Sequence, residues 1–153
     1  MSRAFVKETD AELPPPPERP VSAHPNFVTA QGLAAIEAEL ARLDAAHAAA
    51  VRAGDREAIA LTQRDQRYWT ARRASAQVVA DPPADGRVHF GSTVTLERGD
   101  GRRQTFRIVG EDEADPAQGT IAHVSPLARA LTGKQAGDVV PAGDGEAEIL
   151  TIA

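Results

Sequence analysis

Residues 53–57, with the sequence AGDRE, divide a long alanine-rich region that contains no proline between Asn26 and Asp81. Alanine favours helices, whereas glycine followed by aspartate favours the end of one helix and the start of another. Gly54 can end the first helix in the left-handed conformation, and Asp55 can cap the second. With Thr29 as the N-cap of the first helix, the pattern predicts two long helices joined by a tight turn.

Hydrophobic spacing on the two sides of this turn predicts an antiparallel coiled-coil hairpin. On each side, one set of residues recurs at alternating intervals of three and four, which is the spacing of a heptad seam. Facing positions then have a constant sum of residue numbers, so that His47 faces Arg64 and the turn is centred between residues 55 and 56. Arms of about 22 residues would extend roughly 33 Å. The two seams are Leu33, Ile36, Leu40, Leu43, His47 and Ala50, and Leu61, Arg64, Tyr68, Ala71, Ser75 and Val78.

The first 26 residues differ in composition from the rest of the chain. Four consecutive prolines at 14–17, followed by Pro20 and Pro25, exclude helix and favour the extended polyproline II conformation. We expect residues 1–26 to form an extended, mobile and disordered tail. Such a tail serves either as a tether or as a ligand for a proline-recognising domain.

From Gly86 onwards, apolar and polar residues alternate, which is typical of strands. A short helix is predicted from its N-cap Ser125, with Pro126 in its first position and Gly133 after its end. We therefore expect an α+β protein, in which a hairpin at 27–80 precedes a compact, twisted antiparallel-sheet domain at 81–153. The expected strands are 88–90, 93–97, 105–109, 120–124, 138–140 and 146–152, with a turn at 99–101.

Composition excludes several classes of protein. The 153 residues include no cysteine, which rules out disulfide scaffolds, thiolate zinc sites and cysteine nucleophiles. A net charge of −5 and an aromatic content of 4% disfavour bulk binding of free nucleic acid and an aromatic-lined pocket. No apolar run is long enough to span a bilayer, and residues 1–8 lack the apolar segment of a secretory signal, so a cytoplasmic location is expected.

Two charged groups stand out, but neither forms an active site. The second helix carries a basic face, which is either solvated or placed near a phosphate backbone or an acidic protein surface. Residues 111–115 form an acidic loop, either solvated or cation-binding, without the spacing of a calcium loop. Trp69, beside the seam, is expected to pack at the base of the hairpin against the next domain or to contact a partner. We expect a protein that is not itself an enzyme and has no cofactor or metal of its own. The arginines of the basic face are Arg56, Arg64, Arg67, Arg72 and Arg73.

Several segments resemble the Gre family of bacterial transcript-cleavage factors. They are 28–33 (VTAQGL), 86–94 (GRVHFGSTV), 106–115 (FRIVGEDEAD) and 125–134 (SPLARALTGK), followed by Gly137-Asp138. Their order and spacing match the family's C-terminal domain, and the resemblance covers roughly residues 27–153. It implies an FKBP-like fold for the C-terminal domain, which docks on RNA polymerase at the mouth of the secondary channel while the coiled coil enters the channel.

The resemblance also implies roles for particular residues. In the family, two acids at the tip help to hold Mg²⁺ and its water at the polymerase active site, where the polymerase hydrolyses backtracked RNA. The tip candidates here are Asp55 and Glu57, any Mg²⁺ is shared with the polymerase, and nascent RNA and DNA are contacted only within the elongation complex. The helix that begins at Pro126 either docks on the polymerase or only packs its own domain. The docking candidates are Ser125, Pro126, Leu127 and Arg129.

The tip departs from the family pattern, which is Gly-Asp, two residues, Glu and Asn. Gly54 and Asp55 match, but Ala58 stands where the Glu belongs, and Glu57 comes one residue early. The region from Thr29 to Phe90 is about 20 residues shorter than usual in the family, which costs each arm roughly 15 Å of reach. Asp55 is therefore either a metal-positioning acid or only the cap of the second helix.

Three functions follow from this interpretation. The first is an RNA polymerase-binding elongation regulator of the Gre type, acting through the secondary channel with weak or no cleavage stimulation. The second is a true transcript-cleavage factor that uses Asp55 and Glu57, and the third is a plain protein-interaction module. Peptidyl-prolyl isomerase activity would need an aromatic-lined pocket, for which the domain offers only Phe90 and Phe106. An intramolecular hairpin satisfies its own seam, so a monomer is expected.

Overall fold

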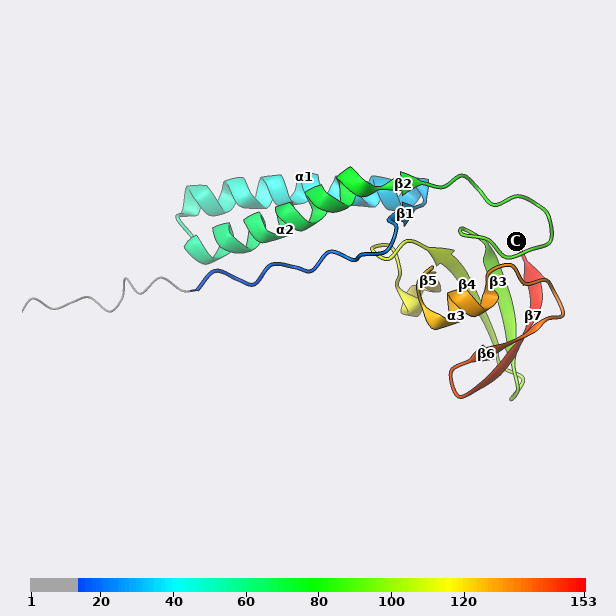
Figure 1. Cartoon of the computed structure of the whole chain (residues 1–153). Coiled ribbons are helices and arrows are strands. Elements are labelled where there is room, and N and C mark those ends of the chain that lie inside the picture. Colours follow the sequence, from blue (N-terminus) through cyan, green and yellow to red (C-terminus); the bar gives the residue numbers. More distant parts are fainter. Residues whose placement is uncertain (1–13) are drawn as a thin grey trace, which may run out of the picture.

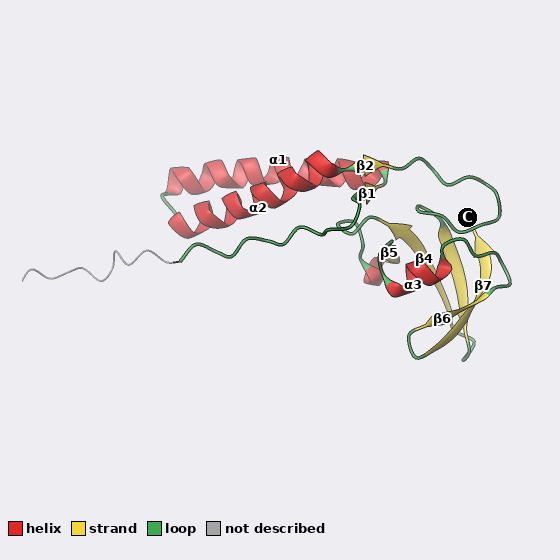
Figure 2. Cartoon of the chain, viewed as in Figure 1, coloured by secondary structure: helices red, strands yellow, loops and turns green. Residues whose placement is uncertain are grey.

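The structure, a computed structural model, describes residues 14–153, and the first half of the expected tail, residues 1–13, lies outside the described part of the chain. A helical hairpin stands beside a sheet domain, and an extended N-terminal segment runs back along the hairpin (Figures 1 and 2). Helix α1 spans Ala30–Ala53 and helix α2 spans Arg56–Ser75. The predicted architecture of hairpin and sheet domain is therefore confirmed.

The ends of both hairpin helices follow the predicted capping pattern. The Thr29 hydroxyl accepts a hydrogen bond from the Gly32 amide at the start of α1. Gly54 ends α1 with a φ of 64°, in the left-handed region that glycine adopts without strain. The Asp55 carboxylate accepts a bond from the Ala58 amide at 3.1 Å, which starts α2. These bonds satisfy amides that the helices themselves leave unpaired.

The seam is correct on α1 but partly wrong on α2. Ile36, Leu43 and Ala50 are buried at intervals of seven residues, as a heptad requires. On the other side, Leu61 is 37% exposed and Val78 is 54% exposed. Val78 lies beyond the helix, because α2 ends at Ser75.

Polar contacts across the hairpin show the actual register. His47 Nδ1 lies 3.0 Å from the hydroxyl of Thr62, not beside Arg64, and the Gln66 amide donates to Asp44 at 2.9 Å. Each α1 residue thus faces a position one or two residues earlier in α2 than predicted. The predicted register came from the spacing of the two complete seams, and the α2 seam included Leu61 and Val78, which the structure leaves 37% and 54% exposed.

The C-terminal domain is a five-stranded sheet in the order β5-β4-β3-β7-β6. Neighbouring strands are antiparallel, as predicted, except β4 and β5, which run parallel and make the sheet mixed. A loop containing a 3-10 helix, Pro116–Gln118, carries the chain back to start β5 in that direction. The strands are β3 (Thr93–Arg98), β4 (Arg103–Val109), β5 (Thr120–Ala122), β6 (Val139–Ala142) and β7 (Gly145–Ile152).

One short helix, α3 (Pro126–Leu131), closes the hydrophobic core of this domain. Ser125 caps it through the Ala128 amide, as predicted. Ala128 and Leu131 are fully buried against Leu96 and other strand residues. The expected strand at 88–90 is absent, and this part of the chain contributes only an isolated bridge between Arg87 and Gln135.

The base of the hairpin, which we call the root, joins the two parts of the molecule. Strand β1 (Phe27–Val28) pairs in parallel with β2 (Gln77–Val78), so the chain enters α1 beside the point at which it leaves α2. The opposite end, residues 53–57, is the tip. Within residues 14–153, no helix combines the length and the apolar character that crossing a membrane requires.

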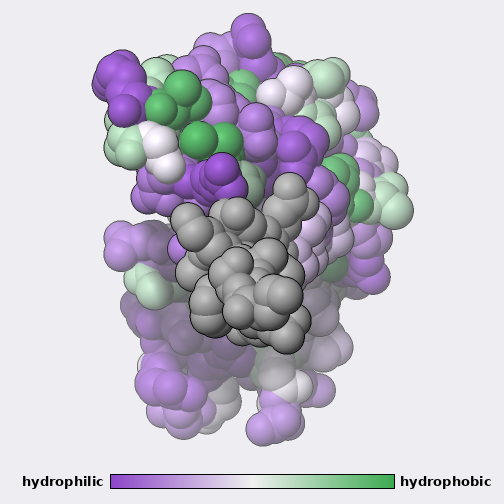
Figure 3. All heavy atoms as spheres, turned by 90° about the vertical axis from the view of Figure 1, so that its left-hand side faces the viewer, coloured by the Kyte–Doolittle hydropathy of each residue, from purple (hydrophilic) through white to green (hydrophobic). Residues whose placement is uncertain are grey.

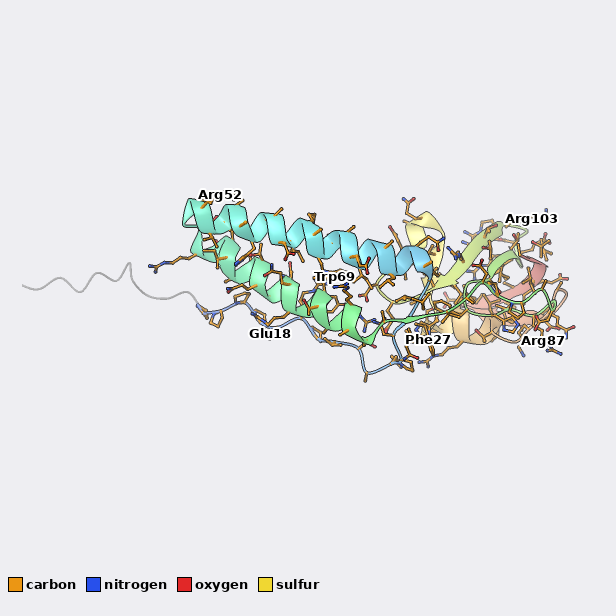
Figure 4. All side chains as sticks on the ribbon, turned by 90° about the horizontal axis from the view of Figure 1, so that it is seen from above. Glu18, Phe27, Arg52, Trp69, Arg87 and Arg103 are labelled. Carbon is orange, nitrogen blue, oxygen red and sulfur yellow. The ribbon has the colours of Figure 1, made fainter. Side chains whose placement is uncertain are left out.

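Residues 14–26, which we call the strap, are extended as expected but are not a free tail. Figures 1 and 4 show the strap running along α2 from the root toward the tip. The Arg67 guanidinium donates to Glu18 at 2.5 Å, and the Arg19 guanidinium lies 3.9 Å from the centre of the Tyr68 ring. This part of the predicted mobile tail is therefore packed on the hairpin.

Candidate functional site

The two acids at the tip, Asp55 and Glu57, are both exposed but have different roles in helix α2. Asp55 holds the Ala58 amide, which confirms its role as the cap of α2. Glu57 lies in the first turn of α2, where a negative charge is favourable beside the helix N-terminus. Within residues 14–153, no group of three or more histidine or acidic side chains is placed to hold a metal ion. Seen from the tip side, hydrophilic residues cover most of the surface (Figure 3).

The predicted docking residues on and beside α3 divide into exposed and packed ones. Pro126 and Arg129 are exposed, whereas Ser125 and Leu127 are half-buried. Leu127 packs against the core of the sheet domain, and Ser125 caps the helix. The exposed surface that α3 offers to a partner therefore centres on Pro126 and Arg129.

The predicted basic face does not exist as one surface. Arg72 is 1% exposed, because it is part of the root rather than of a solvated face. Arg64 is paired with its neighbour Asp65 at 2.8 Å. Arg67 is paired with Glu18 of the strap and Arg73 with Glu37 at 3.6 Å. Arg56 is exposed near the tip.

The root contains a buried polar network that the sequence did not reveal. The Arg72 guanidinium donates to the Asp112 carboxylate at 2.5 Å and to the Asn26 side-chain oxygen at 2.7 Å. A second carboxylate, that of Glu111, lies 3.7 Å from Arg72. Asn26 in turn donates to the Arg72 carbonyl at 2.8 Å. Arg72 thus ties the strap, α2 and the sheet domain together.

The acidic loop that was expected to be solvated or cation-binding supplies these contacts. Besides Asp112 and Glu111, it contributes Glu113, which accepts a hydrogen bond from the Thr29 hydroxyl at 2.5 Å. The Tyr68 hydroxyl also donates to Asp112. Burial, together with this bond to a carboxylate, raises the pKa of Tyr68 to about 12, so the hydroxyl stays protonated and keeps donating. The loop therefore fixes the hairpin to the sheet domain.

The available signal for this network was the spacing of Tyr68 and Arg72. Residues four apart lie on one face of a helix, so both side chains could reach the same carboxylate. Nothing in the sequence, however, places the acidic loop opposite that face. Trp69 was expected at the root against the next domain or in contact with a partner. Its ring meets that of Tyr68 edge-on at 5.1 Å and lies 5.6 Å from the guanidinium of Arg19 in the strap.

An aromatic cluster completes the root. The His123 ring lies 5.3 Å from the Phe27 ring and 5.6 Å from the Phe90 ring, in edge-on geometry. Burial lowers the pKa of His123 below its ordinary value, against a smaller opposing effect of the Glu111 carboxylate. Phe27 comes from β1, whereas Phe90 and His123 belong to the sheet domain, so this cluster also spans the junction.

A groove of about 350 Å³ lies beside the root. It is bounded by the start of α1, by residues 78–82 and by Phe90, Gly91 and Arg107. None of the predicted site residues lines it. The predicted tip acids and docking residues therefore lie away from this groove.

These features define a protein that presents a helical arm from a small sheet domain. Comparison with known proteins identifies its family. The family model "Transcription elongation factor, GreA/GreB, C-term" matches residues 83–153. The chain is 36% identical over 132 residues to transcription elongation factor GreA of Desulfovibrio desulfuricans, covering 74% of this chain and 82% of that protein. The chain belongs to the GreA/GreB family of transcription elongation factors.

Other relatives match mainly one part of the chain. It is 48% identical over 91 residues to GreB of Neisseria meningitidis serogroup A, covering 55% of this chain and 56% of that protein. It is 47% identical over 87 residues to GreA of Alkalilimnicola ehrlichii, and the match covers 52% of this chain and 54% of that protein. The matched region thus spans about half the length of these relatives. Among solved structures, GreA factor homolog 1 of Thermus thermophilus aligns over 85% of this chain and 99% of its own, at 20% identity and a TM-score of 0.41.

Proposed function

We propose that this protein is a regulator of transcription elongation that binds RNA polymerase and acts through the secondary channel with weak or no stimulation of RNA cleavage. Family membership supports the polymerase as the partner, because its relatives carry the name transcription elongation factor. The structure of the tip supports the other part of the proposal, which is weak or absent stimulation of cleavage. The Asp55 carboxylate caps α2, and Ala58 occupies the position of the family's second acid.

The length of the arm supports the same proposal. With 24 residues in α1 and 20 in α2, the helices extend about 36 Å and 30 Å. An arm of this size, shortened by roughly 15 Å relative to the family, ends short of a catalytic centre that a full-length arm reaches. It still fills the channel and excludes other molecules from it.

The sheet domain supplies the docking contact in this proposal. Pro126 and Arg129 on α3 are exposed, and a short capped helix presents them rigidly. Arg129 offers a guanidinium suited to an acidic surface on the partner. The chain acts as a monomer, and the polymerase remains the catalyst. Any Mg²⁺ belongs to the polymerase active site, and RNA and DNA are approached only within the elongation complex.

A second candidate, a true cleavage factor, draws on the exposure of Asp55 and Glu57 at the end of the arm. A carboxylate that accepts one backbone bond retains lone pairs for a metal ion. The two candidates differ in one measurable result, which is cleavage by the protein alone.

The test is a transcript-cleavage assay on a stalled, backtracked elongation complex with RNA polymerase of the same organism. We expect no cleavage by the protein alone and inhibition of cleavage by an added GreA. Cleavage that is lost in Asp55→Asn, a change that keeps the cap but removes the charge, would establish the second candidate instead. Absence of polymerase binding would leave a plain interaction module.

The docking helix is tested in the same assay. Arg129→Ala should weaken inhibition of GreA about tenfold, the loss expected for a charged contact at an interface. Arg103→Ala, an exposed arginine on β4, is the matched control and should leave inhibition unchanged. Equal loss in both variants would contradict docking through α3.

A further inference from the structure

The strap contacts α2 through a group of three side chains that together surround a guanidinium. The guanidinium carbon of Arg19 lies 3.9 Å from the centre of the Tyr68 ring and 5.6 Å from that of Trp69. The two rings meet edge-on at an interplanar angle of 87°. A terminal nitrogen of Arg19 lies 3.5 Å from the carboxylate of Asp65. We call Asp65, Tyr68 and Trp69 the arginine site.

The chemistry of this site selects arginine over other side chains. A flat, weakly hydrated guanidinium stacks on an aromatic ring and donates in its own plane to a carboxylate at the same time. A lysine ammonium has the charge but no flat face, so it cannot stack on a ring and at the same time donate in the plane of that stack. The site therefore recognises a guanidinium rather than positive charge alone.

The contacts that hold Arg19 are individually weak. The Asp65 oxygen that faces Arg19 also accepts from Arg64 at 2.9 Å, so its charge is already shared and the contact to Arg19 is long. The neighbouring pair of Glu18 and Arg67 has side chains that are 64% and 55% exposed. Exposed ion pairs of this kind contribute little and are screened by salt.

One end of the strap, by contrast, is firmly anchored. Asn26 is 3% exposed and bonds Arg72 through both side-chain atoms. Arg19 is seven residues away, so the tether keeps it near the site at an effective concentration of about 1 mM or more. The strap, whose course along α2 is visible in Figure 4, is thus fixed at the root and held along the arm only by weak contacts.

We propose that the arginine site is a binding site on the flank of the hairpin that Arg19 occupies in cis. The strap is then a reversible cover, which an arginine side chain of another protein displaces. Displacement exposes the Tyr68 and Trp69 rings and frees the strap to swing about Asn26.

The chain contains a single tryptophan, Trp69, so its fluorescence reports directly on the site. Quenching by acrylamide should rise about twofold between low salt and 1 M NaCl, because salt screens the ion pairs that hold the strap. Arg19→Ala should show the high quenching already at low salt. Arg52→Ala, which removes an exposed arginine from the last turn of α1, is the matched control and should behave as wild type. Identical quenching in Arg19→Ala and wild type at low salt would overturn the proposal.

Occupation of the site by an arginine from a second chain is tested on full-length Arg19→Ala protein, in which the site is uncovered, with a synthetic peptide of residues 14–22. The peptide should lower acrylamide quenching back toward the wild-type value, whereas the same peptide with lysine in place of Arg19 should not. The full-length Arg19→Lys variant should likewise remain highly quenched. Equal protection by both peptides, or by neither, would refute an arginine-specific site.

Discussion

At the root of the hairpin, Arg72 is 1% exposed and bonds Asn26 and Asp112, whereas at the tip the exposed Asp55 bonds one amide of its own helix. The root joins three segments distant in sequence, so its geometry sets the direction in which the arm points. The tip depends only on its own turn. The acids of the tip can therefore be replaced without disturbing the contacts that hold the root together.

The largest expected effect comes from breaking the root at Arg72. Arg72→Ala leaves the Asp112 carboxylate, whose side chain is only 11% exposed, without its cation. The change should lower the free energy of unfolding by about 3–5 kcal/mol. Urea unfolding followed by circular dichroism measures the loss. Arg73→Ala, next in sequence but exposed and paired at 3.6 Å, is the control and should cost under about 0.5 kcal/mol. Similar losses in both variants would mean that the network does not hold the root.

A second change separates the two parts of the molecule without touching a charge. A Cβ added at Gly110 would lie 2.3 Å from the Phe27 carbonyl oxygen, and that oxygen belongs to the backbone of β1. Gly110→Ala should therefore push β1 away and cost about 1–3 kcal/mol, as overpacking does elsewhere. Gly99→Ala, where nothing lies within 4 Å, is the matched control. An unchanged unfolding midpoint in Gly110→Ala would show that β1 can move away from residue 110 without a loss of stability.

Sequence reasoning succeeded where structure is local. The caps at Thr29, Asp55 and Ser125 and the turn at Gly54 depend on residues within one helical turn, and all four are confirmed. Five of the six expected strands were found because alternation is also a local pattern. The segment 88–90 also alternates, but it is not a strand of the sheet. Val88 is buried in the core, and the only β-type pairing in this part of the chain is the isolated bridge at Arg87.

Long-range placement could not be predicted from the same patterns. The pairing of Arg72 with Asp112 spans 40 residues, and only the fold brings the two together. The strap is a similar case, because a proline-rich composition predicts its extended conformation but not the helix on which it lies. For the candidate site, the sequence of the turn was enough to locate the tip acids. It could not show which of the four docking candidates on and beside α3 are exposed, because exposure depends on how α3 packs on the sheet.

At the tip, the effect of a mutation should be smaller than at the root. Asp55→Ala removes the cap of α2 and should cost about 1 kcal/mol. Asp55→Asn keeps an accepting oxygen and should cost almost nothing in stability. Urea unfolding of both variants separates the cap from the charge. A large loss in Asp55→Asn would show that the carboxylate charge stabilises the turn.

The smallest expected effect is the pH dependence contributed by His123. Its pKa is lowered by burial in the folded chain, so the folded state binds fewer protons than the unfolded state below about pH 6.5. Stability from this group is complete above that pH and is lost as pH falls through the folded pKa. His123→Phe keeps an aromatic ring between Phe27 and Phe90 but cannot be protonated, and the charged groups that act on this position, Glu111, Arg72, His24 and Arg129, are present in both proteins. As the pH falls from 7.5 to 5.5, the wild type should therefore lose stability that the variant keeps. The free energy of unfolding in urea, measured for both proteins at each pH, checks this expectation. A stability difference between the two proteins that does not change with pH would contradict this role of His123.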